Sequence, residues 1–316
     1  MVVQPSTTDP TEVPARRPPA AARFRTPLNL PRGLRIALLL SPALLVVAVF
    51  FLTGVTQAVA QSLGYQPFLP GGHLSLDAYR GLFTDPAVRA SLALTARISI
   101  IPTVTSALLA VAAALLIRRL GRARSWVTGI FQANLAVPHL VGALCMVLLL
   151  SQAGLLSRLT HAAGLTDSVA AFPALTSDRF GWAIIAEYLW KETPFLTVIA
   201  LAALGRGVED LEQAARALGA GRWQRLRHVT LPILAPAVAA GSVLVFTFTA
   251  GSYEVPYLLG RPYPATLPVV ALQYYNDTDL TARPEAMAVA VMIAAFTCVV
   301  VVFYLALAGR LARRVL

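Results

Sequence analysis

The sequence predicts an all-α polytopic membrane protein with six transmembrane helices and both termini in the cytoplasm. Of its 316 residues, 57% are apolar and 13% are charged, whereas soluble domains carry about a quarter charged residues. The apolar residues form long uninterrupted segments, unlike the short alternating segments of a β-barrel. This hydrophobicity excludes a disordered chain. Only two cysteines are present, which excludes a disulfide-stabilised scaffold.

Six segments are long and apolar enough to cross a bilayer as helices. About 30 Å of hydrocarbon is crossed at 1.5 Å per residue, so a span needs roughly 20 mainly apolar residues whose backbone groups bond within the helix. The predicted spans are residues 36–56, 90–117, 127–151, 181–204, 232–251 and 286–308.

The arginines indicate the orientation of these spans, because short loops rich in Arg and Lys stay in the cytoplasm. The formal net charge is +11, and Lys191 is the only lysine. Eighteen arginines lie before the first span, in the second-to-third and fourth-to-fifth loops, and after the sixth span, against six in the other loops. Both termini are therefore predicted to be cytoplasmic. The positive net charge thus reflects the orientation of the spans in the membrane and does not indicate a nucleic-acid partner.

Composition separates two regions of the chain. Residues 1–32 are polar and rich in Pro, Thr and Arg, with too few apolar side chains for a core, so they are predicted to form a flexible basic cytoplasmic tail. Residues 33–316 hold the six spans and form the membrane domain. Within this domain, the loop of residues 205–232 joins the fourth and fifth spans on the cytoplasmic side.

The sequence of this loop predicts two short helices joined by a turn. Glu212 suits the first part of a helix, and Ala214 and Ala215 lie on an apolar stripe at helical spacing. Gly219 permits a sharp turn, and a short basic amphipathic stretch follows it. From composition alone, the loop is either a connector lying on lipid headgroups, anchored by Trp223, or a helical knob whose small residues allow a cytoplasmic partner to approach closely.

The loop resembles the EAA loop of the integral-membrane permease subunits of bacterial ATP-binding-cassette importers. In that family Glu-Ala-Ala is followed after three residues by Gly and, after nine more, by Ile, any residue, Leu and Pro. Gln213 replaces the family's Glu, with Glu212 just before it. Shorter matches at residues 76–83, 190–195 and 254–260 follow the family's order. The matching loop residues, at the same spacing, are Gln213, Ala214, Ala215, Gly219, Val229, Leu231 and Pro232.

This resemblance implies the type I importer permease fold, in which the loop docks on a cytoplasmic ATP-binding subunit. It further implies a dimer of ATP-binding subunits, a second permease subunit, identical or homologous, and an extracytoplasmic substrate-binding protein. The chain itself is not expected to be an enzyme, because a phosphate-binding loop needs Lys before Ser or Thr and Lys191 precedes Glu192. The residues assigned to the ATPase-coupling loop are Glu212, Gln213, Ala214, Ala215, Gly219, Ala220, Leu231 and Pro232.

Ionisable residues in the fourth span are candidates for lining the translocation route. Glu187 and Lys191 have the spacing of an intrahelical ion pair, and Glu192 requires another partner. Tyr253 and Glu254, at the outer end of the fifth span, are predicted to border the substrate entrance. A structural pair packed against another helix explains the charges equally well. The rival function is a gradient-driven secondary transporter, in which Glu187 and Glu192 would bind protons or sodium.

The substrate is predicted from weaker signals. Residues 211–220 and 267–291 resemble the polyamine branch of the family more than its sugar branch, and the carboxylates suit a cation; a sugar is the alternative. No cluster of His, Cys and carboxylates has metal-ligand spacing, so neither a metal nor a cofactor is expected. The expected partners are the other importer subunits and the lipid bilayer.

Overall fold

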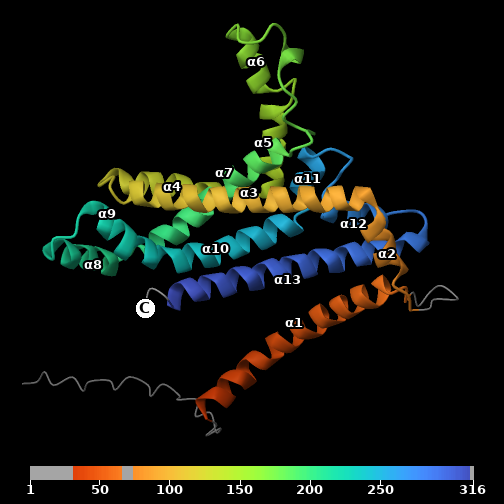
Figure 1. Ribbon diagram of the computed structural model, residues 1–316, viewed down its shortest axis with the longest axis horizontal. Helices are drawn as coiled ribbons and strands as arrows, with labels where there is room; N and C mark the ends of the chain where they lie inside the picture. The colour runs from red at the N-terminus through yellow and green to blue at the C-terminus, as the bar shows by residue number, and fades with distance from the viewer. Residues whose placement is uncertain (1–30, 66–73, 314–316) are drawn as a thin grey trace, which may run out of the picture. The chain divides into compact units, whose positions relative to one another are not determined.

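The computed structural model describes residues 31–65 and 74–313, and the regular structure of these residues is entirely helical (Figure 1). Residues 1–30 of the predicted tail lie outside the described residues. The chain divides into two units, Met1–Leu52 and Thr53–Leu316, at a point within α1 (Arg32–Ser62). α1 contains the first predicted span, and its apolar side chains are exposed, as a helix that faces lipid or another subunit requires.

Four long helices build the larger unit and coincide with the second, fourth, fifth and sixth predicted spans. They are α3 (Pro86–Ile117), α7 (Trp182–Ala203), α10 (Leu231–Gly251) and α13 (Arg283–Arg313). α3 packs along α7, α10 packs against both, and α13 contacts α10 (Figure 1). Asp85 caps α3 by accepting a hydrogen bond from the Ala87 N–H at 2.7 Å.

A row of small hydroxyl residues lines the buried face of α3. Ser91, Thr95, Ser99 and Thr103 recur every four residues, and all four are buried. Thr95, Ser99 and Thr103 each donate to the carbonyl four residues earlier, at 2.7–2.8 Å. These hydroxyl protons are thus used within the helix itself, and the Thr95 oxygen also accepts a hydrogen bond from the Leu267 N–H at 2.9 Å. Small residues of this kind allow membrane helices to approach closely.

The third predicted span, residues 127–151, is not a single helix. α4 (Ala123–Leu135) ends before Pro138, α5 (His139–Leu150) begins after it, and α6 (Leu155–Ala162) follows beyond a turn. Pro138 has extended backbone angles (φ −62°, ψ 145°), which end the helical path at this residue, whereas Pro102 and Pro194 lie inside continuous helices. α4 packs on α7, whereas α5 packs on both α7 and α11 (Glu254–Leu259).

By length and apolar composition, five helical segments of the described chain can cross a membrane. α7 is not among them, although it spans 22 residues, because it contains three ionisable residues: Glu187, Lys191 and Glu192. All three are buried within the protein, so whether α7, the fourth predicted span, can cross the membrane depends on how their charges are satisfied. The five segments are Gly33–Ser62, Pro86–Ile117, His139–Ala162, Arg222–Gly251 and Leu280–Ala306.

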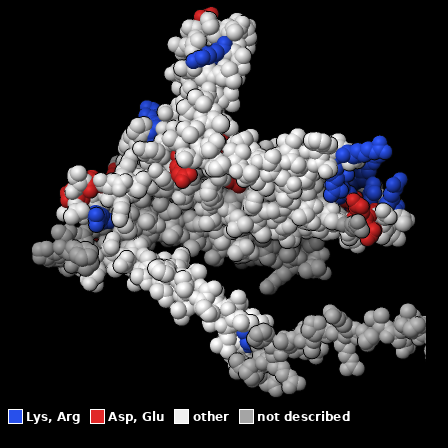
Figure 2. All heavy atoms as spheres, turned by 180° about the vertical axis from the view of Figure 1, so that it is seen from behind, with Lys and Arg blue, Asp and Glu red and all other residues white. Residues whose placement is uncertain are grey.

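Shorter helices lie at the two ends of the larger unit. At one end, α8 (Arg206–Ala217), α9 (Arg222–Arg225) and a π-helical segment (Leu226–Thr230) lead into α10. At the other end lie α2, α11 and α12 (Figure 1). Figure 2 shows basic side chains gathered at the end formed by α8 and α9, as the predicted orientation requires. The remaining short elements are α2 (Asp77–Thr84), α12 (Leu267–Tyr275) and the 3₁₀ turns Val169–Ala171 and Leu280–Ala282.

Candidate functional site

The predicted coupling loop forms two helices joined by a tight turn. α8 ends at Ala217, and Gly219 then adopts φ +84°, a left-handed conformation that favours glycine. The Gly219 N–H donates to the Arg216 carbonyl and the Ala220 N–H to the Ala215 carbonyl, both at 3.0 Å. These two bonds form a Schellman motif, which satisfies the last carbonyls of α8. The turn predicted from Gly219 is thus present in the structure.

α9 begins immediately after this turn and continues into α10. The Gly221 N–H donates to Gln224 Oε1 at 2.8 Å, which satisfies an otherwise free donor at the start of α9. The π-helical segment then joins α9 to α10 without a break, and Pro232 lies in the first turn of α10, immediately after the wider turns of the π-helical segment. The chain thus runs from the turn at Gly219 into a long transmembrane helix.

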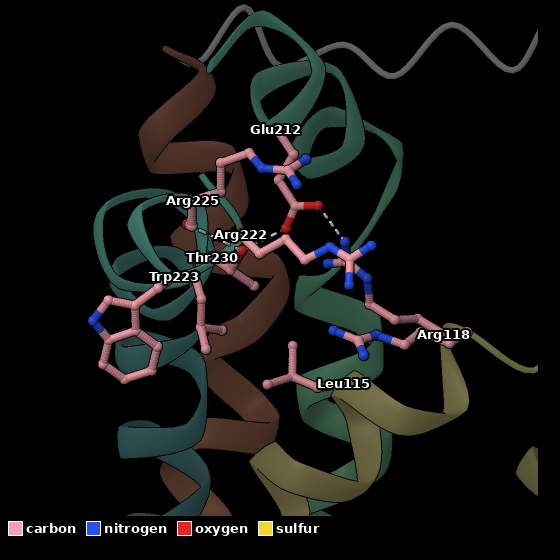
Figure 3. Close-up of a pocket in the computed structure, with 9 residues that line it drawn as sticks. Leu115, Arg118, Glu212, Arg222, Trp223, Arg225 and Thr230 are labelled. Atoms are coloured by element: carbon pink, nitrogen blue, oxygen red, sulfur yellow. Dashed lines mark hydrogen bonds and ion pairs between the residues drawn. The ribbon is translucent and has the colours of Figure 1, made fainter. Parts of the chain in front are cut away.

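Glu212 connects the coupling loop to two membrane helices. Its carboxylate accepts hydrogen bonds from Arg118, which follows the last residue of α3, and from the Thr230 hydroxyl, which immediately precedes α10 (Figure 3). The Glu212 and Arg118 side chains are only 17% and 19% exposed. An ion pair so shielded from water is stronger than one on the open surface. These bonds join α8 to the ends of both α3 and α10.

The carboxylate of Glu212 is held in its charged form. Burial alone raises the pKa of this carboxyl, but hydrogen bonds from Arg118 and Thr230, with the charges of Arg118 and Arg225, outweigh burial and hold the pKa below its ordinary value of 4.5. Gln213, which replaces the family's Glu, is exposed. The neighbouring Glu212 therefore supplies the carboxylate that forms the ion pair.

The turn presents apolar side chains to solvent. Leu218, between α8 and Gly219, is 88% exposed, and Trp223 on α9 is 67% exposed. Gln213 and Ala214 are exposed on α8, whereas Ala215 and Ala220 are partly buried. An exposed leucine beside small residues, on a backbone fixed by hydrogen bonds, is suited to insertion into a groove of another protein.

Lys191 satisfies backbone carbonyls at the break between α4 and α5. Its Nζ donates to the carbonyl oxygens of Asn134 at 2.7 Å and Val137 at 2.6 Å. Pro138 has no N–H to donate in this turn; the Asn134 carbonyl accepts a hydrogen bond from the Val137 N–H at 3.1 Å, and the buried ammonium adds a second donor to it and a donor to the Val137 carbonyl. The predicted ion pair with Glu187 is not among the salt bridges of the described residues, because these carbonyls take up the Lys191 donors.

His139 contacts both buried carboxylates of α7. His139 Nδ1 lies 3.2 Å from Glu187 Oε1, and Nε2 lies 3.7 Å from Glu192 Oε1. His139 thus lies between the two carboxylates, within hydrogen-bond distance of Glu187 alone, and connects the start of α5 to α7. A cavity of about 610 Å³ borders this cluster and is also lined by Phe195 and Phe248. The cluster of His139, Glu187 and Glu192 thus connects α5 to α7, and its His139 and Glu192 form part of the polar lining of this cavity.

The predicted entrance residues lie at the opposite end from the coupling loop. Glu254 begins α11 and is exposed, and the Tyr253 ring is 5.5 Å from that of Tyr257. The structure does not bring Tyr253 and Glu254 together with Glu187, Lys191 and Glu192 in one pocket among the described residues. Within those residues, no group of three His, Cys, Asp or Glu side chains is placed to hold a metal.

Sequence reasoning missed several partners of these residues. In the sequence, Arg118 indicates only the orientation of the spans, and the carbonyls of Asn134 and Val137 leave no trace in side-chain patterns. Pro138 was the one available signal for the broken helix, because a proline within an apolar segment frees carbonyls that need another donor.

Comparison with known proteins agrees with this architecture. The family described as "Binding-protein-dependent transport system inner membrane component" matches residues 106–316. The inner membrane ABC transporter permease protein YdcU of Escherichia coli is 30% identical over 251 residues, which cover 75% of this chain and 76% of that protein. YnjC, another inner membrane ABC transporter permease protein of E. coli, is 28% identical over 68% of this chain and 42% of that protein.

A solved structure has the same fold over most of its length. The crystal structure of a bacterial ABC transporter involved in the import of the acidic polysaccharide alginate contains a chain with a TM-score of 0.73 and 21% identity; the match covers 88% of this chain and 96% of that one. The chain described here therefore belongs to the inner membrane components of binding-protein-dependent transport systems and is a multi-pass permease subunit of an ABC importer.

Proposed function

We propose that this permease couples to a separate ATP-binding subunit through the α8–α9 turn and, with a second permease subunit, forms the route of a small solute. The turn at Gly219 carries this proposal, because it exposes Leu218 on a backbone that Glu212 ties to α3 and α10. Closure of two ATP-binding subunits around ATP would draw two such turns together. The ion pair would pass that movement to the membrane helices.

The remaining partners follow from the same assignment. A second permease, identical or homologous, would supply the other half of the route, and a dimer of ATP-binding subunits would lie in the cytoplasm. An extracytoplasmic binding protein would deliver the solute; one matched structure is titled as an alginate ABC transporter in complex with an alginate pentasaccharide-bound periplasmic protein.

The substrate is proposed only as a small solute. The polyamine prediction used the carboxylates Glu187, Glu192 and Glu254, but the first two contact His139 inside the protein, which leaves only Glu254 exposed. Relatives named for a substrate include a molybdenum permease of Mycobacterium bovis and a trehalose/maltose permease of Thermococcus litoralis. A thermal-shift screen of the cognate binding protein against polyamines, sugars and oxyanions would identify the class.

The coupling proposal is tested by substitution in the turn. Gly219→Asp should abolish ATP-driven uptake, because it places a charged side chain on the docking surface at a left-handed residue. Uptake and membrane abundance are measured in cells that also produce the ATP-binding subunit and the binding protein. Gly221→Ala is the matched control: Gly221 has φ −66°, and its added Cβ would meet only Gln224 Oε1, at 3.7 Å.

Two outcomes would contradict the coupling role. One is normal uptake by Gly219→Asp at equal membrane abundance. The other is uptake by the purified permease alone, in liposomes without ATP or partner subunits, which would instead indicate a gradient-driven transporter.

A further inference from the structure

At the end of the larger unit formed by α8 and α9, a cavity of about 620 Å³ lies between the end of α3 and α9. Four arginines line it, against one carboxylate, that of Glu212 (Figure 3). Three apolar side chains complete the lining together with Thr230. The arginines are Arg118, Arg119, Arg222 and Arg225, and the apolar residues are Leu115, Trp223 and Leu226.

The positive charge of this cavity exceeds what its own carboxylate neutralises. Glu212 pairs with Arg118, so three guanidinium groups remain without a carboxylate partner within the lining. The buried Nη1 of Arg118 and Nε of Arg225 have no hydrogen-bond partner among the described residues. Like charges that share a partly enclosed space repel each other, and a bound anion with several acceptor oxygens would relieve this repulsion.

The cavity lies beside the tip of the proposed docking surface and shares Trp223 with it. Leu218, Gly219 and the exposed Gln213 are not among its lining residues. Its walls come from the last turns of a membrane helix and from α9, where the transmembrane segments meet the cytoplasm. The combination of arginines with leucines and the exposed Trp223 suits a group that is anionic at one end and apolar at the other.

We propose that this cavity is a phosphate-binding site. Guanidinium groups recognise phosphate oxygens through paired, charge-assisted hydrogen bonds. The apolar lining favours the phosphate of an anionic phospholipid headgroup over a free phosphate ion. Because Glu212 lines the same cavity, the bound phosphate would lie beside the ion pair that holds α8 to α3. The inference does not depend on docking of an ATP-binding subunit.

The test uses the full-length chain purified in a non-ionic detergent. Native mass spectrometry measures binding of dioleoylphosphatidylglycerol and dioleoylphosphatidylcholine, and calorimetry measures binding of inorganic phosphate. The double variant Arg119→Gln/Arg222→Gln removes two exposed arginines of the cavity and leaves the Glu212–Arg118 pair intact. Loss of these charge-assisted donors is expected to weaken binding at the highest-affinity phosphatidylglycerol site by at least about tenfold.

The matched control is Arg216→Gln/Arg227→Gln, which removes the same charge from exposed residues outside the cavity. This control should retain the high-affinity site. Binding of inorganic phosphate that depends on Arg119 and Arg222, without preference for phosphatidylglycerol, would support the site and assign it to a soluble phosphate. Equal binding by the two double variants, for every ligand, would overturn the proposal.

Discussion

At the scale of single residues, Glu212 shows how one side chain can replace a family residue from the adjacent position. The family pattern places its carboxylate at the position of Gln213, yet Gln213 is exposed and Glu212 makes the ion pair. Successive helical residues are rotated by about 100°, so the neighbour faces α3 while Gln213 faces solvent. The position of Glu212 beside Gln213 is visible in the sequence, but its partner is not, because Arg118 lies 94 residues earlier in the chain.

Glu212→Gln should lower ATP-driven uptake severalfold, by a factor that stays constant between pH 6 and 8. A hydrogen bond to a charged group contributes about 1–3 kcal/mol to the stability of the folded structure. The folded-state pKa of Glu212 is lowered from 4.5, so the stabilisation is fully present above that value and is lost only as the pH falls through the folded pKa. Uptake by both proteins is measured across this pH range.

The control for this experiment is Glu209→Gln, which removes an exposed carboxylate from the first turn of the same helix and should have little effect. A wild-type advantage over Glu212→Gln that disappears between pH 8 and pH 6 would contradict the assigned charge state.

At the scale of elements, local patterns were predictable and contacts between distant segments were not. The turn after α8 is predictable because both of its signals are local: the apolar stripe of α8 ends just before Gly219, and glycine favours the left-handed conformation of the turn. The break between α4 and α5 was only indicated by Pro138. Its stabilisation comes from Lys191, more than fifty residues later, through bonds to backbone carbonyls that no side-chain pattern reveals.

The contact between α5 and α7 leaves no room for a side chain at Gly142. A Cβ there would lie 2.9 Å from Glu187 Oε1 and 3.0 Å from the Trp190 ring. Gly142→Ala should therefore destabilise the permease by about 1–3 kcal/mol, as overpacking of a tight interface does. The thermal-unfolding midpoint is measured in detergent and is expected to be lower than that of the wild type.

Gly129→Ala in α4 is the matched control, because an added Cβ meets nothing within 4 Å there. It should leave the midpoint unchanged or raise it slightly, since alanine favours helix more than glycine does. If the two variants unfold at the same temperature, the close α5–α7 contact is not present in the membrane protein.

At the scale of the whole molecule, the order of the helices predicts that the coupling loop and the predicted entrance lie on opposite sides of the membrane. α10 is the only long helix between the α8–α9 turn and α11. Leu218→Cys and Tyr257→Cys, each in a Cys145→Ser/Cys298→Ser background, introduce thiols at residues that are 88% and 60% exposed.

A membrane-impermeant maleimide should label Cys at position 218 only in inverted vesicles and Cys at position 257 only in intact spheroplasts. The arginine distribution predicts this arrangement, because the loop of residues 205–232 lies on the arginine-rich side. Labelling of both positions from the same side would contradict the topology.

The burial of Lys191 has a practical consequence for the chemistry of the folded protein. It is the only lysine in the sequence, it is 4% exposed, and its ammonium bonds to two carbonyls at the helix break. Amine-directed reagents, such as succinimidyl esters, therefore have no accessible side-chain target in the native permease. Their reaction at Lys191 would report the separation of α7 from the α4–α5 break.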